Sequence, residues 1–85
     1  AVSKKVINYP NPFTNTTTIK LPISSKSIQI KVYDVMGRMV DYKNINTDST
    51  GRTATYIAPN FNNGIYKYSI KDNNNKLYSG TFIVN

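Results

Sequence analysis

Short stretches of the chain alternate between apolar and polar residues with a period of two. Between residues 27 and 33, Ile28, Ile30 and Val32 alternate with more polar or amphipathic neighbours. Because successive side chains of a β-strand point to opposite faces of the sheet, this alternation predicts a strand with one buried face. The same pattern recurs along the chain and predicts seven strands, at residues 4–9, 15–21, 27–33, 38–43, 52–58, 64–71 and 76–84.

Turn-forming residues separate the predicted strands. Asp34–Gly37 (DVMG) begins with Asp and ends with Gly, as type I turns commonly do, and Asp72–Asn75 (DNNN) tolerates the positive φ of a reverse turn. Pro59–Asn63 interrupts the pattern around one apolar residue, Phe61, which we expect to close one end of the core. Short strands about ten residues apart, with no helical periodicity, predict an all-β antiparallel sandwich.

The segment Tyr9–Phe13 (YPNPF) interrupts the β pattern early in the chain. Proline fixes φ near −65° and has no N–H group to donate to a sheet. Pro10 and Pro12 therefore predict that the chain leaves its first strand in an extended corner. We expect Tyr9 and Phe13, which flank this corner, to fold back onto the open end of the sandwich.

Length and composition favour one small folded domain with little capacity for catalysis. The chain has 85 residues, of which 39% are hydrophobic, and seven Tyr and three Phe supply much of this hydrophobic content. It has no Cys and no His, which removes disulfides, thiolate metal sites and the commonest general base. Its four acidic residues are Asp34, Asp41, Asp48 and Asp72. We predict no enzymatic activity, no cofactor and no metal site.

The net charge of +7 raises the question of an anionic partner. The eleven Lys and Arg are spread along the chain, and its arginines, the residue that reads guanine and grips phosphate bidentately, are Arg38 and Arg52. Spread lysines favour solvated strand faces that discourage edge-to-edge pairing, with weak attraction to an anionic cell surface as a second interpretation. No apolar run reaches the ~20 residues of a membrane span. We predict neither nucleic-acid binding nor membrane insertion.

Four stretches in a fixed order carry a family resemblance. They are YPNPF at residues 9–13, TTTIKL at 16–21, IQIKVYDVMGRMV at 28–40 and NFNNGIYKYSI at 60–70, and a final apolar strand follows them. In this order and spacing the sequence resembles the type A C-terminal sorting domain of the type IX (Por) secretion system of Bacteroidetes. The resemblance extends over residues 6–84.

This resemblance implies an Ig-like sandwich of about seven strands at residues 6–85, preceded by the end of a linker at residues 1–5. It also implies a non-catalytic sorting signal that directs a covalently fused N-terminal cargo through the periplasm to the type IX outer-membrane machinery. A cell-surface sortase usually removes such domains, and the cargo is then attached to the outer-membrane surface or released.

The motif positions of the family also have structural interpretations in this chain. We expect Asp34 to accept backbone N–H groups in its turn, with Arg38 as its partner, and Gly37 to adopt a conformation that a Cβ would strain. We expect Gly64 to begin a strand closely under the core ring of Tyr66. The motif positions are Tyr9, Pro10, Asn11, Pro12, Phe13, Tyr33, Asp34, Gly37, Arg38, Gly64 and Tyr66.

Contact with the secretion machinery is expected chiefly from the last strand. The final strand of the family commonly carries a Lys near its end, whereas this sequence has none after Lys76, so Lys76 or the backbone edge is expected to serve instead. One hypothesis is that the machinery adds a strand to an unpaired edge beside the apolar residues 82–84. The candidate recognition residues are Lys76, Gly80, Phe82, Ile83 and Val84.

Two other functions remain open from the sequence. Tyr33, Tyr42 and Tyr78 would offer rings for sugar stacking if exposed, which favours a carbohydrate-binding or adhesive module as the alternative, although scattered tyrosines do not form a platform. A small glycosidase needs two carboxylates about 5–10 Å apart. Asp34 and Asp41 lie on one predicted hairpin, but both occupy positions typical of turn or solvent-face residues.

Overall fold

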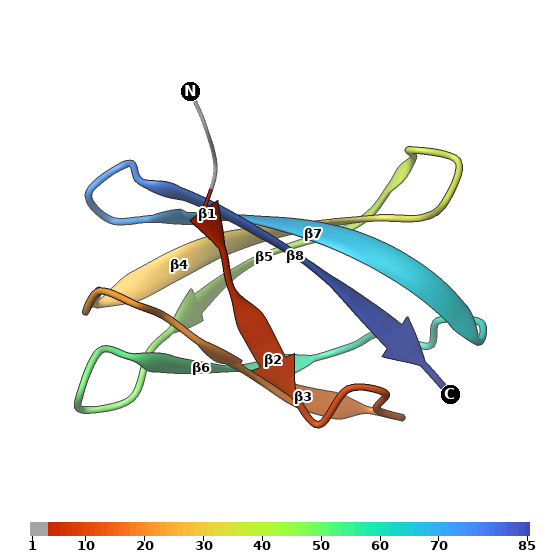
Figure 1. Cartoon of the computed structure of the whole chain (residues 1–85), viewed down its shortest axis with the longest axis horizontal. Coiled ribbons are helices and arrows are strands. Elements are labelled where there is room, and N and C mark those ends of the chain that lie inside the picture. Colours follow the sequence, from red (N-terminus) through yellow and green to blue (C-terminus); the bar gives the residue numbers. More distant parts are fainter. Residues whose placement is uncertain (1–3) are drawn as a thin grey trace.

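The structure, a computed structural model that describes residues 4–85, is a sandwich of two β-sheets (Figure 1). One sheet has five strands in the order β1-β8-β7-β4-β5, and the other has three in the order β2-β3-β6. The predicted all-β sandwich is thereby confirmed. The strands are β1 (Lys4–Lys5), β2 (Ile7–Tyr9), β3 (Thr16–Lys20), β4 (Ser27–Tyr33), β5 (Met39–Asn46), β6 (Thr53–Ile57), β7 (Gly64–Asp72) and β8 (Leu77–Val84).

The first predicted strand, residues 4–9, is wrong as a single element. β1 pairs in parallel with β8, whereas β2 pairs antiparallel with β3 in the other sheet, so residues 4–85 contain eight strands. The chain changes sheets at Val6, which is buried and donates its N–H to the carbonyl of Ser79 at 2.9 Å. Figure 1 shows the chain crossing from one layer to the other between β1 and β2 on this side of the sandwich.

The expected linker at residues 1–5 falls partly outside the described residues. Residues 1–3 are not described, and Lys4 and Lys5 form β1. The boundary between linker and domain stays a prediction.

β5 continues beyond its predicted end at residue 43. Its pairing with β4 extends to Asn46, which lies opposite Ser27, and Thr47 then donates its N–H to the carbonyl of Lys26 at 3.1 Å. The partner strand therefore sets the end of β5, because its own side chains carry only a weak alternation. A β-bulge near Val32 and Tyr33 shifts the register of this hairpin.

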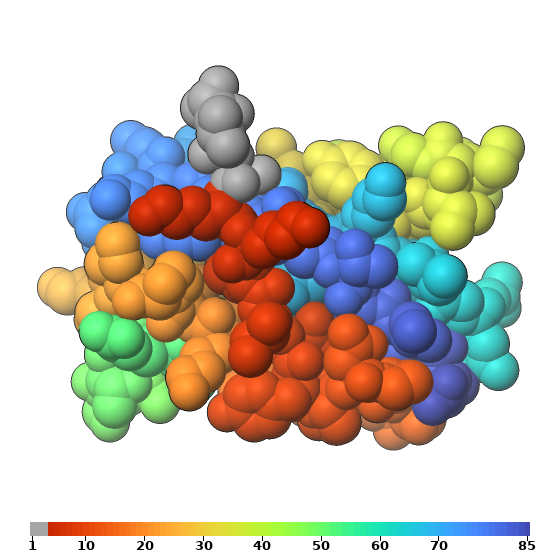
Figure 2. Space-filling view, viewed as in Figure 1, coloured from red at the N-terminus to blue at the C-terminus, as the bar shows by residue number. Residues whose placement is uncertain are grey.

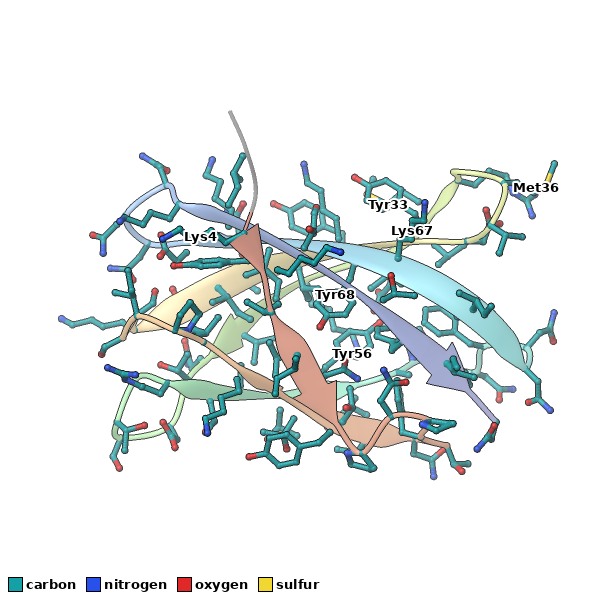
Figure 3. All side chains as sticks on the ribbon, viewed as in Figure 1. Lys4, Tyr33, Met36, Tyr56, Lys67 and Tyr68 are labelled. Carbon is teal, nitrogen blue, oxygen red and sulfur yellow. The ribbon has the colours of Figure 1, made fainter. Side chains whose placement is uncertain are left out.

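The core lies between the two sheets. It includes residues that the alternation pattern assigned to it, such as Ile28, Ile30 and Val32, and others that the pattern did not, such as Val6 and Tyr78. Phe82 of β8, which is fully buried, stands at its centre and contacts four other aromatic rings: Phe13 at 4.8 Å, Tyr68 at 5.4 Å, Tyr56 at 5.8 Å and Tyr66 at 5.9 Å between centroids. Figure 3 shows Tyr56 and Tyr68 in the space between the layers. These rings come from both sheets, so Phe82 joins the two layers.

Phe61 lies at the margin of this core. Its ring is partly buried and stacks on the ring of Tyr66, with centroids 4.7 Å apart. The structure therefore confirms the expectation that Phe61 packs against the end of the core.

Candidate functional site

The N-terminal motif, residues Tyr9–Phe13, runs beside the edge of β8 that β1 leaves uncovered. Figure 2 shows this N-terminal segment packed against the C-terminal strand. Phe13 forms a parallel bridge with Val84, its N–H donates to the carbonyl of Ile83 at 3.0 Å, and its carbonyl accepts from the N–H of Asn85 at 2.9 Å. Both X–Pro bonds of the motif are cis.

The side chain of Asn11 replaces a backbone peptide group on the same edge. Its Nδ2 donates to the carbonyl of Thr81 at 3.1 Å, and its Oδ1 accepts from the N–H of Ile83 at 2.9 Å. A side-chain amide has the same donor and acceptor as a peptide group, so it can pair with a strand where Pro10 and Pro12 remove backbone donors. Together with the bond from Val6 to Ser79, the motif closes the edge of β8.

A buried chain of hydrogen bonds anchors the motif to both sheets. Tyr68 donates from its hydroxyl to Oδ1 of Asn8 at 3.0 Å, Asn8 donates from Nδ2 to Oγ1 of Thr17 at 2.9 Å, and Thr17 donates to the carbonyl of Pro10 at 2.9 Å. Burial raises the pKa of Tyr68 to about 12, so its phenol stays protonated as a donor. Each buried polar group in this chain has a partner, which is the condition for burying it without a large penalty.

Asn8 is a structural residue that the sequence reasoning missed. It is 7% exposed, although Asn is usually found at the surface. Its burial could have been predicted from its position, because Asn8 lies two residues after the apolar Val6 in an alternating segment and therefore faces the same side.

The expectation that the rings flanking the corner fold inward holds for only one of them. Phe13 is 3% exposed and packs edge-on against Phe82, whereas Tyr9 is 50% exposed. Tyr9 is the last residue of β2, in a register that places it opposite Thr18, and its neighbour Asn8 takes the inward-facing position. Strand alternation therefore turns Tyr9 outward.

We expect Asn11→Ala to lower the free energy of unfolding by about 1–2 kcal/mol, because two exposed hydrogen bonds to β8 are lost at about 0.5–1.5 kcal/mol each. Urea denaturation measures the change. Asn60→Ala, in an exposed loop, is the matched control and is expected to alter stability by less than about 0.5 kcal/mol. Equal stability of the two variants would show that the hydrogen bonds of Asn11 to β8 do not stabilise the fold.

The turn between β4 and β5 is built around Asp34. Its Oδ1 accepts from the N–H groups of Met36 at 2.9 Å and Arg38 at 3.0 Å, and its Oδ2 accepts from the guanidinium of Arg38 at 2.9 Å. The backbone N–H of Arg38 and its guanidinium hold the pKa of Asp34 below its usual value. Gly37 has φ 82° and donates its N–H to the carbonyl of Asp34. The structural roles expected for these three residues are therefore observed.

The turn between β7 and β8 repeats this construction. Oδ1 of Asp72 accepts from the N–H groups of Asn74 and Lys76, both at 2.9 Å, and the carbonyl of Asp72 accepts from Asn75, whose φ is 63°. DVMGR and DNNNK are thus the same five-residue turn, in which Asn75 replaces Gly37 and Lys76 replaces Arg38. Asp72 differs from Asp34 in being buried and in accepting from the hydroxyl of Tyr78 at 3.2 Å.

Tyr66 and Gly64 only partly match their expected roles. The ring of Tyr66 is buried, and its hydroxyl donates to the carbonyl of Asn62 at 2.7 Å. A Cβ at position 64 would meet no atom within 4 Å, so Gly64 makes no close approach. The close approach is at Gly80, which lies opposite Tyr68, where a Cβ would come 2.9 Å from Cε1 of Tyr68 and still closer to its Cζ and hydroxyl.

The five candidate recognition residues divide into a buried and an exposed group. Phe82 and Val84 are 0% and 3% exposed, and Gly80 leaves room for a buried ring. Ile83 is 40% exposed, and Lys76 is exposed at a turn. In the folded domain, only Ile83 and Lys76 of this group present side chains to a partner.

All four carboxylates accept hydrogen bonds from the chain itself. In addition to the two turn aspartates, Asp41 accepts from the hydroxyl of Tyr56 at 2.6 Å, and Asp48 accepts from the hydroxyls of Thr50 and Thr53, both at 2.6 Å. The two threonine hydroxyls lower the pKa of Asp48. Among residues 4–85, no group of three acidic, His or Cys side chains could hold a metal ion, and no helix is long and apolar enough to cross a membrane.

The three tyrosines considered for sugar stacking differ in how far they are exposed. Tyr42 is 50% exposed on β5 and Tyr33 is half-buried on β4, whereas Tyr78 is 1% exposed. The expectation that Tyr78 could be exposed is wrong, because the turn aspartate Asp72 holds its hydroxyl inside.

The sequence matches the family described as "Secretion system C-terminal sorting domain" over residues 8–85. No curated protein matches it significantly. Its structure is similar to a DUF3244 family protein with an immunoglobulin-like β-sandwich fold from Bacteroides vulgatus ATCC 8482, with a TM-score of 0.65 and 18% identity over 94% of this chain and 83% of that one. It is also similar to CopC from Methylosinus trichosporium OB3b, with a TM-score of 0.57 and 16% identity over 100% of this chain and 85% of that one. At these identities the likeness shows an Ig-like sandwich fold and no shared function.

Proposed function

The chain belongs to the family of secretion system C-terminal sorting domains, and we propose that it directs a larger, covalently fused cargo protein through the type IX outer-membrane translocon. Membership confirms the resemblance carried by the four sequence stretches. It implies export to the cell surface or the extracellular space. Passage of the cargo through the periplasm and removal of the domain by a surface sortase are further parts of the proposal.

The observation that carries the proposal is the family match over residues 8–85, almost the whole folded unit. Motif residues from the beginning of this unit hold its last strand: Asn11 and Phe13 bind the edge of β8, and Phe13 packs on Phe82. The motif is therefore a means of completing the sandwich. We propose that the machinery recognises the folded domain rather than an extended tail.

The closed edge of β8 bears on how recognition proceeds. An added strand would have to displace Asn11 and Phe13 there, because these two residues already bind the backbone N–H and C=O groups of Thr81, Ile83 and Asn85. We propose instead that side chains exposed on the folded surface make the contact, with Ile83 and Lys76 as candidates. Gly80, Phe82 and Val84 then contribute to recognition only indirectly, because they stabilise the folded domain.

The domain is proposed to be non-catalytic, as members of this family generally are. In support, each carboxylate of the described residues accepts hydrogen bonds that hold a turn, a loop or the two sheets together. Hydrolytic activity of the isolated domain would contradict this part.

A localisation assay tests the sorting role. Residues 1–85 are fused behind a fluorescent protein with a Sec signal and expressed in Bacteroidetes hosts with and without a working type IX translocon. We expect fluorescence at the surface or in the medium only when both the domain and the translocon are present. Retention in the periplasm of both hosts would overturn the proposal.

Variants of the same fusion test the mode of recognition. Ile83→Ala and Lys76→Ala change exposed side chains, and we expect both to reduce export while the domain stays folded. Export of the double variant at the wild-type level would overturn the assignment of these two residues and return attention to the backbone edge.

A further inference from the structure

The outer surface of the five-stranded sheet gathers four lysines, and we call this surface the basic face. Strand register places Lys5, Ser79, Ser69 and Lys31 in one row across β1, β8, β7 and β4. Directly opposite residues point to the same side of a sheet, so both lysines of this row face outward. Lys67 and Lys71 lie two residues to either side of Ser69 on β7 and face the same way, about 13 Å apart at 3.3–3.4 Å per residue.

The basic face carries no carboxylate. Asp34 and Asp48 lie in loops, Asp72 is buried, and Asp41 lies opposite the buried Val32 and binds Tyr56 of the other sheet. Each of these four carboxylates accepts hydrogen bonds within the chain. The lysines of this face therefore have no acidic neighbour on it, and they form a patch of uncompensated positive charge.

The face is hollowed where small residues form its floor. A hollow of about 350 Å³ is lined by Lys5, Lys67, Ser79, Gly80 and Thr81 among others. A second, of about 90 Å³, is lined by Gln29, Lys31, Ser69, Lys71 and Leu77 among others. Ser69 and Ser79 lie directly opposite each other between the two hollows, so the lysines stand around a shallow trough.

Aromatic and amide side chains border the trough. Tyr42 lies opposite Lys31, whose Nζ is 5.7 Å from the ring centroid, and Asn44 lies opposite Gln29. Tyr33 lies opposite Lys67, and Figure 3 shows the two together on the outer side of the sheet. Exposed rings and amides recognise sugar rings and hydroxyls, while lysines recognise the acidic groups attached to them.

Because these features occur together, we propose that the basic face binds an acidic polysaccharide, with carboxylated or sulfated sugars lying along the trough. This function is independent of the sorting role. A nucleic acid fits less well because neither arginine lies on the basic face. A membrane surface fits less well because the exposed apolar residues Ile65, Ile83 and Leu77 lie towards the ends of the face, on either side of its lysines.

The test measures binding of the whole 85-residue chain to polygalacturonate by isothermal titration, with neutral dextran as the uncharged comparison. We expect binding to polygalacturonate only, and weaker binding as salt is raised, because the charges involved are exposed. The triple variant Lys31→Gln, Lys67→Gln, Lys71→Gln is expected to bind about tenfold more weakly, since exposed ion pairs contribute modestly but add together.

A matched triple variant controls for net charge. Lys20→Gln, Lys26→Gln, Arg52→Gln removes the same charge from exposed positions off the basic face and is expected to change affinity less than about twofold. An equal loss of affinity for polygalacturonate in both triple variants would overturn the proposal, since net charge alone would then explain binding. Absence of binding to polygalacturonate would also overturn it. So would tighter binding to anionic phospholipid vesicles or single-stranded DNA that depends on the same three lysines.

Discussion

Phe82→Ala is expected to lower the free energy of unfolding by about 3–5 kcal/mol, the usual cost of removing a fully buried Phe ring. Phe82 is 0% exposed, and its ring contacts Phe13, Tyr56, Tyr66 and Tyr68. No single neighbour could fill the resulting cavity, because these rings come from both sheets and from the N-terminal motif. A domain of this size has a total stability of about 4–13 kcal/mol, so the loss is a large fraction of it.

Urea denaturation measures this effect, and the adjacent residue provides the control. Ile83→Ala removes a side chain that is 40% exposed, and we expect it to cost less than about 1 kcal/mol. A loss for Phe82→Ala no larger than that for Ile83→Ala would contradict the central position of Phe82 in the core.

The two variants also separate folding from recognition in the export assay. Phe82→Ala should reduce export because a larger fraction of the domain is unfolded, with a matching rise in proteolysis. Ile83→Ala should reduce export without either sign of unfolding. The conservative Phe82→Leu, which refills much of the cavity, should recover part of the export lost by Phe82→Ala.

Gly80→Ala is expected to lower the free energy of unfolding by about 2–4 kcal/mol, although it adds only one methyl group. Overpacking of a core typically costs about 1–3 kcal/mol, and an unpaired buried polar group adds to that. The new Cβ would overlap the ring of Tyr68, which is 2% exposed and cannot move without releasing its hydrogen bond to Asn8.

Thr81→Ala is the control for this prediction, since Thr81 is the exposed neighbour on the same strand and is expected to change stability by about 0.5 kcal/mol or less. The NMR signals of the Tyr68 ring provide a second readout and should shift in Gly80→Ala. Wild-type stability together with unchanged ring signals would show that the ring of Tyr68 does not pack against Gly80.

Features that depend on neighbouring residues were accessible from the sequence. The alternation of Ile28, Ile30 and Val32 placed their strand and its buried face correctly, because the period of a strand is a local property. The turn at Asp34 was equally local, since its hydrogen bonds join residues at most four positions apart. Each family motif is likewise a short contiguous stretch, so it can be found in the sequence without knowledge of the fold.

Features that depend on distant segments were not accessible. Val6 is where the chain changes sheets, and this follows from its bond to Ser79 rather than from its own neighbours. Tyr9 and Phe13 flank the same corner, yet only Phe13 is buried: it packs against the distant ring of Phe82, whereas the pairing of β2 with β3 turns Tyr9 outward. Gly64 and Gly80 look alike in sequence, yet a Cβ at position 80 would overlap the ring of Tyr68, whereas a Cβ at position 64 would meet no atom within 4 Å.

The sequence by itself determined an all-β sandwich, most of its core residues, its hairpin turns and its membership of the sorting family. The tertiary structure alone decided that Asn11 closes the edge of β8 across 70 residues of chain, and that Lys5, Lys31, Lys67 and Lys71 share one face. The reason is physical: side-chain period and turn chemistry act over a few residues, whereas register between strands is fixed only when the whole core packs.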